Sequence, residues 1–166
     1  FIGLLDDIRM ALARSRLKLR KRMVTRLSSE VTNIFSSIAP GSDYDSVHID
    51  VEGSISEGAR GRYVFFVKRK LDGRLVPALT RLSDGQKSLL ALSLFIASRR
   101  LKPCKLSLFL LDDPAPNLDE ETKVLLSRAL LELSDTMQIV LSTQSELVAE
   151  RLRGIAHVVD LRALPR

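Results

Sequence analysis

An almost uninterrupted apolar run, residues 106–111 (LSLFLL), restricts the fold more than any other part of this sequence. It has the length of a buried strand, and it ends directly in Asp112 and Asp113. Helical patterns precede and follow it, and further apolar strand patterns come later. Strands that are apolar on both faces and separated by helices form a largely parallel sheet that helices cover on both sides. The sequence therefore predicts an α/β fold, with helices at 84–100, 120–134 and 146–153 and strands at 106–111, 137–141 and 156–161.

The N-terminal part is predicted to be one long helix over residues 1–38, because it contains no proline and Pro40-Gly41 follows it. Its apolar side chains recur every three or four positions, with a gap at Ser15-Arg16. That spacing suits the base of a coiled-coil arm, and equally a helix packed along one side of a domain. The recurring residues are Leu5, Ile8, Leu12, Leu19, Met23, Leu27, Val31, Ile34 and Phe35. We divide the chain into an arm base (1–38) and a head (39–166).

A small β-region is expected after this helix, since the apolar period changes to two. Strands are predicted at 47–51, 62–67 and 74–77, with a turn over 53–61. Asp72-Gly73 is a hairpin signal between the second and third strands.

Positive charge is concentrated at the start of the chain. The net charge is +6, and residues 1–26 hold eight basic side chains against Asp6 and Asp7, so the remaining residues balance to about zero. Such a basic face indicates a nucleic acid or another polyanion, or else the solvated side of a helix. The candidate DNA contacts are Arg14, Arg16, Lys18, Arg20, Lys21 and Arg22.

Several protein classes are disfavoured by what the sequence lacks. No apolar run approaches the roughly 20 residues that span a bilayer, and one cysteine, Cys104, permits no internal disulfide. We expect a cytoplasmic protein with no membrane partner. Because the chain begins with Phe1, we expect it to be a piece of something longer.

A polar segment at residues 83–87 (SDGQK) precedes the apolar helix at 84–100. Ser83 and Asp84 are good N-cap residues, so the segment can be a plain helix cap. A glycine at a helix N-terminus also lets a phosphate approach unpaired backbone N–H groups, which makes an anion site the alternative.

The strand that ends in Asp112 and Asp113 places both carboxylates at the carboxyl edge of a parallel sheet, where ligands bind in such folds. There Asp112 would hold Mg²⁺ through water, and Asp113 would act as the general base on an attacking water. The alternative is an acidic turn before Pro114. Residues 117–119 (Asn-Leu-Asp) then open the next helix, and the following strand has a polar tip, residues 142–145 (STQS), whose Ser142 and Thr143 are also possible helix caps.

This succession of motifs resembles the C-terminal half of an ABC-type ATPase head, most of all the structural-maintenance-of-chromosomes (SMC) group and its double-strand-break-repair relatives. LSDGQ looks like the signature motif, LFLLDDP the Walker B strand, NLD the D-loop and STQS the switch loop, and Lys87 follows the signature as in that group. The resemblance implies the C-terminal lobe of a P-loop NTPase-like head, with a mostly parallel sheet flanked by helices. A long coiled-coil-type helix and a small β-region would precede this lobe.

The resemblance also implies how such a head works. ATP and Mg²⁺ are its cofactors, and two heads, from a homodimer or a paralogue pair, sandwich two ATP molecules. Ser83, Asp84, Gly85, Gln86 and Lys87 would then meet the ATP of the other head, and Asn117, Leu118 and Asp119 would form the D-loop. The implied function is an ATP-driven tether on DNA, bound without sequence preference, in chromosome organisation or repair at the nucleoid. A nuclease or a kleisin-type protein is a further implied partner.

This sequence departs from the family pattern in ways that affect the expected activity. No G-x-x-x-x-G-K-[ST] loop is present, so the chain would be half a head that needs its N-terminal half to bind ATP. Asp113 stands where the family usually has glutamate, and Gln144 where it has histidine, so hydrolysis is expected to be slow. The alternatives are a degenerate head that only dimerises and binds DNA, and the nucleotide-binding subunit of a transporter.

Overall fold

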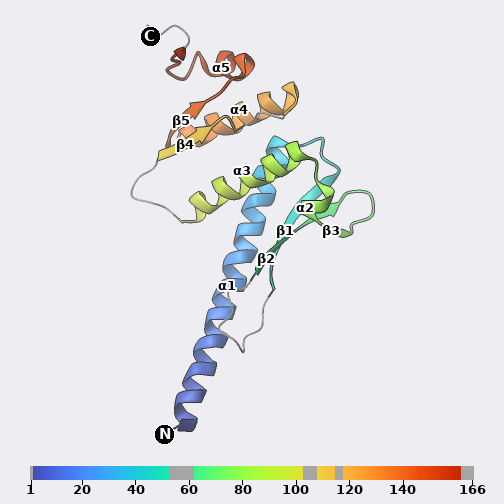
Figure 1. Ribbon diagram of the computed structural model, residues 1–166, viewed down its shortest axis with the longest axis vertical. Helices are drawn as coiled ribbons and strands as arrows, with labels where there is room; N and C mark the ends of the chain where they lie inside the picture. The colour runs from blue at the N-terminus through green and yellow to red at the C-terminus, as the bar shows by residue number, and fades with distance from the viewer. Residues whose placement is uncertain (1, 53–61, 103–107, 115–117, 162–166) are drawn as a thin grey trace.

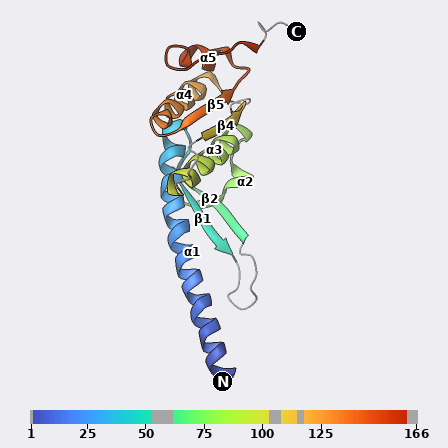
Figure 2. The ribbon, with the colours of Figure 1, turned by 90° about the vertical axis from the view of Figure 1, so that its left-hand side faces the viewer.

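The computed structural model describes residues 2–52, 62–102, 108–114 and 118–161. Its longest element is α1 (Ile2–Ile38), which confirms the predicted helix. The N-terminal half of α1 projects from the rest of the molecule, whereas its C-terminal half contacts β1, α3 and α4 (Figures 1 and 2). None of the helices in the described ranges is long and apolar enough to cross a membrane.

The predicted β-region is a three-stranded antiparallel sheet. It comprises β1 (Tyr44–Glu52), β2 (Arg62–Arg69) and β3 (Leu75–Pro77) in that spatial order. The hairpin signal is confirmed: Gly73 has a φ of +68°, and its N–H donates to the carbonyl oxygen of Arg69 at 2.9 Å. A short helix that the sequence had not indicated, α2 (Ala78–Arg81), follows β3. The predicted turn at 53–61 lies outside the described residues.

Side chains of α1 bond the outer edge of β1. Thr32 Oγ1 accepts a hydrogen bond from the Val47 N–H at 2.9 Å and donates to the Val47 carbonyl oxygen at 3.1 Å. Ser28 Oγ accepts from the Ile49 N–H at 3.0 Å. Four helical residues rise about 6 Å, and two strand residues rise about 6.6 Å, so the two spacings match. The helix thus satisfies backbone groups that an edge strand would otherwise expose.

The second half of the chain alternates helices and strands. In chain order the elements are α3 (Asp84–Leu101), β4 (Leu108–Asp112), α4 (Glu120–Ser134), β5 (Gln138–Ser142) and α5 (Glu146–Leu152). β4 and β5 pair in parallel, from Leu108 opposite Gln138 to Asp112 opposite Ser142. The predicted α/β class and the order of these elements are therefore confirmed.

Two expectations about this half are wrong. Residues 156–161 form no strand, and within the described part of the chain they pair with neither β4 nor β5. Among the described residues, the parallel sheet is also covered on one face only: Leu110 is 68% exposed and Val140, its ladder partner, is 50% exposed. The physical reason is that side chains alternate along a strand, and only the face with Phe109, Leu111 and Ile139 meets packed residues.

One core holds both halves together. Its largest fully buried side chains come from α1, α3 and α4, and include Phe35, Ile38, Ile96 and Leu126. The link from α3 to β4 is aromatic: the rings of Phe95 and Phe109 meet edge to face with centroids 4.9 Å apart. The C-terminal half of α1 is therefore part of the head's core, which a purely external arm would not be.

Candidate functional site

The parallel register brings Asp112 and Ser142 side by side at the carboxyl edge of the sheet. They are Cα partners at the last position of the ladder, and both lie on the uncovered face, in line with Leu110 and Val140. The Ser142 hydroxyl donates to Asp112 Oδ1 at 2.5 Å. The predicted strand-end carboxylate thus has a fixed partner from the next strand.

Asp113 has the backbone of a sharp turn. Its φ of 38° is the one positive value at a non-glycine position among the described residues. Its N–H points back to β5 and donates to the Ser142 carbonyl oxygen at 3.0 Å and to Ser142 Oγ at 3.3 Å. Aspartate tolerates this region better than most residues, at a cost on the order of 1–2 kcal/mol. The two bonds to Ser142 thus hold this turn directly after Asp112.

The residues at this edge fit a magnesium ion that is shared with a nucleotide. The described residues contain no group of three or more His, Cys, Asp or Glu side chains that would form a protein-only metal cage. Mg²⁺ bound to a nucleotide needs less, since one or two carboxylates, water molecules and phosphate oxygens complete its shell. Asp112 is exposed, and the Ser142 bond occupies one of its oxygens, so the other can accept a bond from metal-bound water.

The polar segment 83–87 is a complete capping box in this structure. Ser83 Oγ accepts from the Gln86 N–H at 3.2 Å, and Gln86 Oε1 accepts from the Ser83 N–H at 3.1 Å. Asp84 pairs with Lys87 at 3.0 Å, and its side chain is 88% exposed. These bonds stay within the first turn of α3, so the structure does not join the segment to the acidic edge. Both predictions, cap and anion site, remain compatible with it.

The remaining candidates lie at two further helix starts. Asp119 is the N-cap of α4: its carboxylate accepts bonds from the Thr122 N–H at 2.8 Å and the Thr122 hydroxyl at 3.0 Å. These hydrogen bonds lower the pKa of Asp119. Leu118 is buried and Asn117 lies outside the described residues. Gln144 is exposed in the loop between β5 and α5, two residues beyond Ser142.

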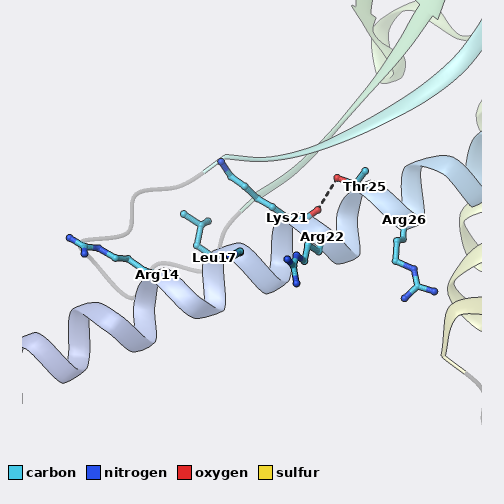
Figure 3. A pocket seen from close by; sticks show the side chains of 7 residues that line it. Arg14, Leu17, Lys21, Arg22, Thr25 and Arg26 are labelled. Atoms are coloured by element: carbon cyan, nitrogen blue, oxygen red, sulfur yellow. Dashed lines mark hydrogen bonds between the residues drawn. The ribbon is translucent and has the colours of Figure 1, made fainter.

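The six basic candidates on α1 are all exposed, and no ion pair joins any of them to another described residue. They divide between two sides of the helix. At about 100° per residue, Arg14, Lys18 and Lys21 share one stripe, and Arg16 and Arg20 lie roughly opposite. With Leu17, Arg22, Thr25 and Arg26 the stripe lines a groove of about 680 Å³. Figure 3 shows Leu17 and Lys21 pointing to the side on which the strands lie, and Arg26 pointing away.

Sequence reasoning missed the role of Ser142, which had been interpreted as a possible cap for α5. The N-cap of α5 is Ser145, and the bond that shapes this loop runs from the Ser145 N–H to Thr143 Oγ1 at 3.0 Å. The available signal was positional: Asp112 and Ser142 both end apolar strands that were predicted to be parallel. Only the register makes them partners.

Alternating helices and strands, with carboxylates at the carboxyl edge of a parallel pair, are the features of an α/β fold of the P-loop NTPase type. The chain belongs to the family described as "AAA domain, putative AbiEii toxin, Type IV TA system", whose model matches residues 4–150. It is 30% identical over 151 residues to Arcadin-4 of Pyrobaculum calidifontis, and the match spans 91% of this chain but 18% of that relative.

Solved SMC structures share the fold. One comes from work on ATP-driven dimerization and DNA-stimulated activation of SMC ATPases; it is 21% identical with a TM-score of 0.64, over 81% of this chain and 76% of that one. Another is the Pyrococcus furiosus SMC head with an extended coiled coil, bound to the C-terminal domain of ScpA. It is 19% identical with a TM-score of 0.66, over 90% of this chain and 35% of that one. The predicted likeness to SMC heads is thus confirmed for the fold.

Proposed function

We propose that this chain is the C-terminal half of an SMC-like ATPase head that tethers DNA and is completed by an N-terminal half carrying the phosphate loop. One observation carries the proposal: the strand-end carboxylates of a P-loop-type sheet lie beside an apolar face that nothing in the described residues covers. Leu110 and Val140 are neighbours on that face, and both are at least half exposed. In the proposed head, the N-terminal half would cover this pair.

The exposed apolar side chains near residue 160 support the same proposal. Ile155, Val159 and Leu161 are 70%, 56% and 72% exposed, and residues 156–161 belong to neither sheet of the described residues. A strand from the N-terminal half that lay beside residues 156–161 would supply that partner. Residues 156–161 would then form a strand, and the face with Leu110 and Val140 would be buried in the same completed domain.

Within a complete head, each candidate residue has a distinct task. Mg²⁺ would neutralise charge on the ATP phosphates, and Asp112 would hold a water of its shell. Asp113 would take the proton of the attacking water, and Gln144 would orient that water by hydrogen bonding. Both are weaker than the family's residues, so turnover would be slow.

The segment 83–87 would act on the ATP of a second head, together with Asn117, Leu118 and Asp119 of the D-loop. Support comes from its isolation in this chain, where its bonds remain within the start of α3 and the acidic edge lies on other elements. A positive helix end is suited to meet a γ-phosphate that another molecule presents. The second head is a copy of this protein or a paralogue.

DNA would contact the stripe of Arg14, Lys18 and Lys21. The exposed apolar seam of the arm (Leu5, Ile8, Leu12, Leu19 and Met23, all at least 47% exposed) lies about 120–180° round the helix from Arg14, counting 100° per residue. A second helix of a coiled coil would cover that seam and not the stripe, which lies on the side of α1 that faces the strands (Figure 3). Arg9, Arg16 and Arg20 flank the seam, so they would face the second helix instead.

The ATP-binding part and the DNA-binding part of this proposal have separate tests. Calorimetry with Mg·ATP should detect no binding above micromolar affinity to residues 1–166 alone, and should detect it after the N-terminal half is added. Micromolar binding by residues 1–166 alone would contradict the half-head. A mixture that binds ATP and pairs its heads without turnover would favour the degenerate head, as Asp113 and Gln144 suggest.

For DNA, two variants with the same change in net charge form a matched pair. Reversing Arg14, Lys18 and Lys21 to glutamate should flatten the salt slope by about 0.9 per lost phosphate contact, equally for unrelated sequences. Reversing Arg9, Arg16 and Arg20 should have the smaller effect. Equal effects would show that only total charge matters, and no effect would leave the basic stretch as a solvated helix face.

We also propose a nucleoid location in the cytoplasm and a kleisin-type or nuclease partner. The P. furiosus head is bound to ScpA, and a coiled-coil arm base is the shared feature that would offer this chain a comparable docking place.

A further inference from the structure

We infer that Ser142 is a positioning residue for the metal-water site, because its hydroxyl orients the Asp112 carboxylate and ties it to the loop that carries Gln144. This inference rests on the proposed ATPase function. It concerns a residue whose sequence context suggested only a helix cap.

The first support is the number of bonds that Ser142 makes across the strand ends. The Ser142 hydroxyl donates a hydrogen bond to Asp112 Oδ1 at 2.5 Å. Two oxygens of Ser142 accept from the Asp113 N–H: the hydroxyl oxygen at 3.3 Å and the carbonyl oxygen at 3.0 Å. One residue of β5 therefore holds the side chain of Asp112 and the backbone of Asp113.

The second support is that this hydroxyl takes no part in capping α5 among the described residues. Ser145 is the N-cap of α5, and Thr143 Oγ1 accepts the turn bond of the loop. A hydroxyl on an exposed strand end is normally solvated, and a bond to a carboxylate is one of the stronger alternatives. The serine is thus committed to Asp112 and has no part in capping.

The chemical consequence follows from the two oxygens of a carboxylate. With Oδ1 held by Ser142, the rotation of the Asp112 side chain is restricted and Oδ2 is presented in one direction. Partners that orient a metal-binding carboxylate typically change metal affinity or activity about 10–100-fold when they are removed. Ser142 also lies two residues before Gln144, so a shift of the switch loop would move the carboxylate with it.

The test uses the full-length protein that contains this chain, in three variants. Ser142→Ala removes the hydroxyl, Ser142→Thr retains it at a strand end where β-branched residues are tolerated, and Ser134→Ala is a matched control at the end of α4, where the hydroxyl bonds only Leu131 O. Two quantities are measured: the Mn²⁺ affinity of the protein saturated with a non-hydrolysable ATP analogue, from the signal of bound Mn²⁺ in electron paramagnetic resonance, and the Mg²⁺ concentration that gives half-maximal ATPase activity.

We expect Ser142→Ala to weaken Mn²⁺ binding about tenfold and to raise the half-maximal Mg²⁺ concentration by a similar factor. Ser142→Thr and Ser134→Ala should match the wild type. Unchanged Mn²⁺ affinity in Ser142→Ala, Ser142→Thr behaving like Ser142→Ala, or no Mn²⁺ binding by the wild type would each overturn the inference. A wild type that binds Mn²⁺ but does not hydrolyse ATP would defeat the proposed ATPase, and the Mn²⁺ comparison would still decide the role of Ser142.

Discussion

Replacing Thr32 by valine tests whether side chains of α1 serve as the missing neighbour of β1. Valine has nearly the shape of threonine and a similar helix propensity. The change therefore removes one oxygen and little else. That oxygen accepts a hydrogen bond from the Val47 N–H and donates one to the Val47 carbonyl oxygen. Val47 is only 1% exposed.

The expected loss of stability follows from these two bonds. A buried polar group left without its partner costs about 1–3 kcal/mol. Thr32 itself is half-buried, so water can reach part of the site and reduce the penalty. We expect Thr32→Val to lower the free energy of unfolding by about 2 kcal/mol. Ser28→Ala should lower it by about 1 kcal/mol, since Ser28 bonds only the Ile49 N–H.

Urea denaturation measures the stability, and amide hydrogen exchange locates the damage. In Thr32→Val, exchange should accelerate at Val47 more than in β2. Thr25→Val is the matched control, because Thr25 is exposed on the same helix and its hydroxyl bonds only Lys21 O at 3.0 Å. If both threonine variants lose the same stability, or if Val47 exchange does not change, the helix merely lies against the strand and the reasoning fails.

Three further predictions concern the head. Leu110→Glu should prevent association with the N-terminal half without unfolding this chain, since Leu110 is 68% exposed; light scattering of the mixture would show retained association if the face is not an interface. Asp113→Glu should raise kcat in the assembled head, each tenfold gain being about 1.4 kcal/mol of barrier, and a slower enzyme would contradict the assigned base. Thr122 hydrogen bonds lower the pKa of Asp119, so the stability they give is complete above the ordinary aspartate pKa of about 3.9 and is lost as pH falls through the lower folded value. Asp119→Asn keeps a good cap and should flatten the stability profile in that acid window, as denaturation from pH 5 to 2 would show.

Local patterns in the sequence were sufficient for most of the elements. The absence of proline before Pro40 predicted α1, and the LSDGQK segment predicted the start of α3, because both depend on neighbouring residues alone. Residues 156–161 failed as a strand since a strand also needs a partner, which local patterns do not reveal. α2 is too short to leave an apolar period.

The sequence predicted that Asp112 and Asp113 lie at a strand end, because they follow an apolar run, and β4 ends at Asp112. It did not predict the hydrogen bonds between the elements. The Ser142 bond depends on the register between two strands, and the edge bonds of Ser28 and Thr32 depend on how α1 lies against β1. Both arrangements are tertiary, so no spacing within one segment predicts them.

The match between α1 and β1 has a mechanical consequence. Because Thr32 and Ser28 meet Val47 and Ile49 in step, the helix cannot slide along the strand gradually. It would have to break these bonds together and move by about 6 Å before they could form again. When the helix is displaced by less than this distance, the antiparallel sheet should move together with it. A rotation of α1 at Ser28 and Thr32 would therefore be transmitted to the sheet.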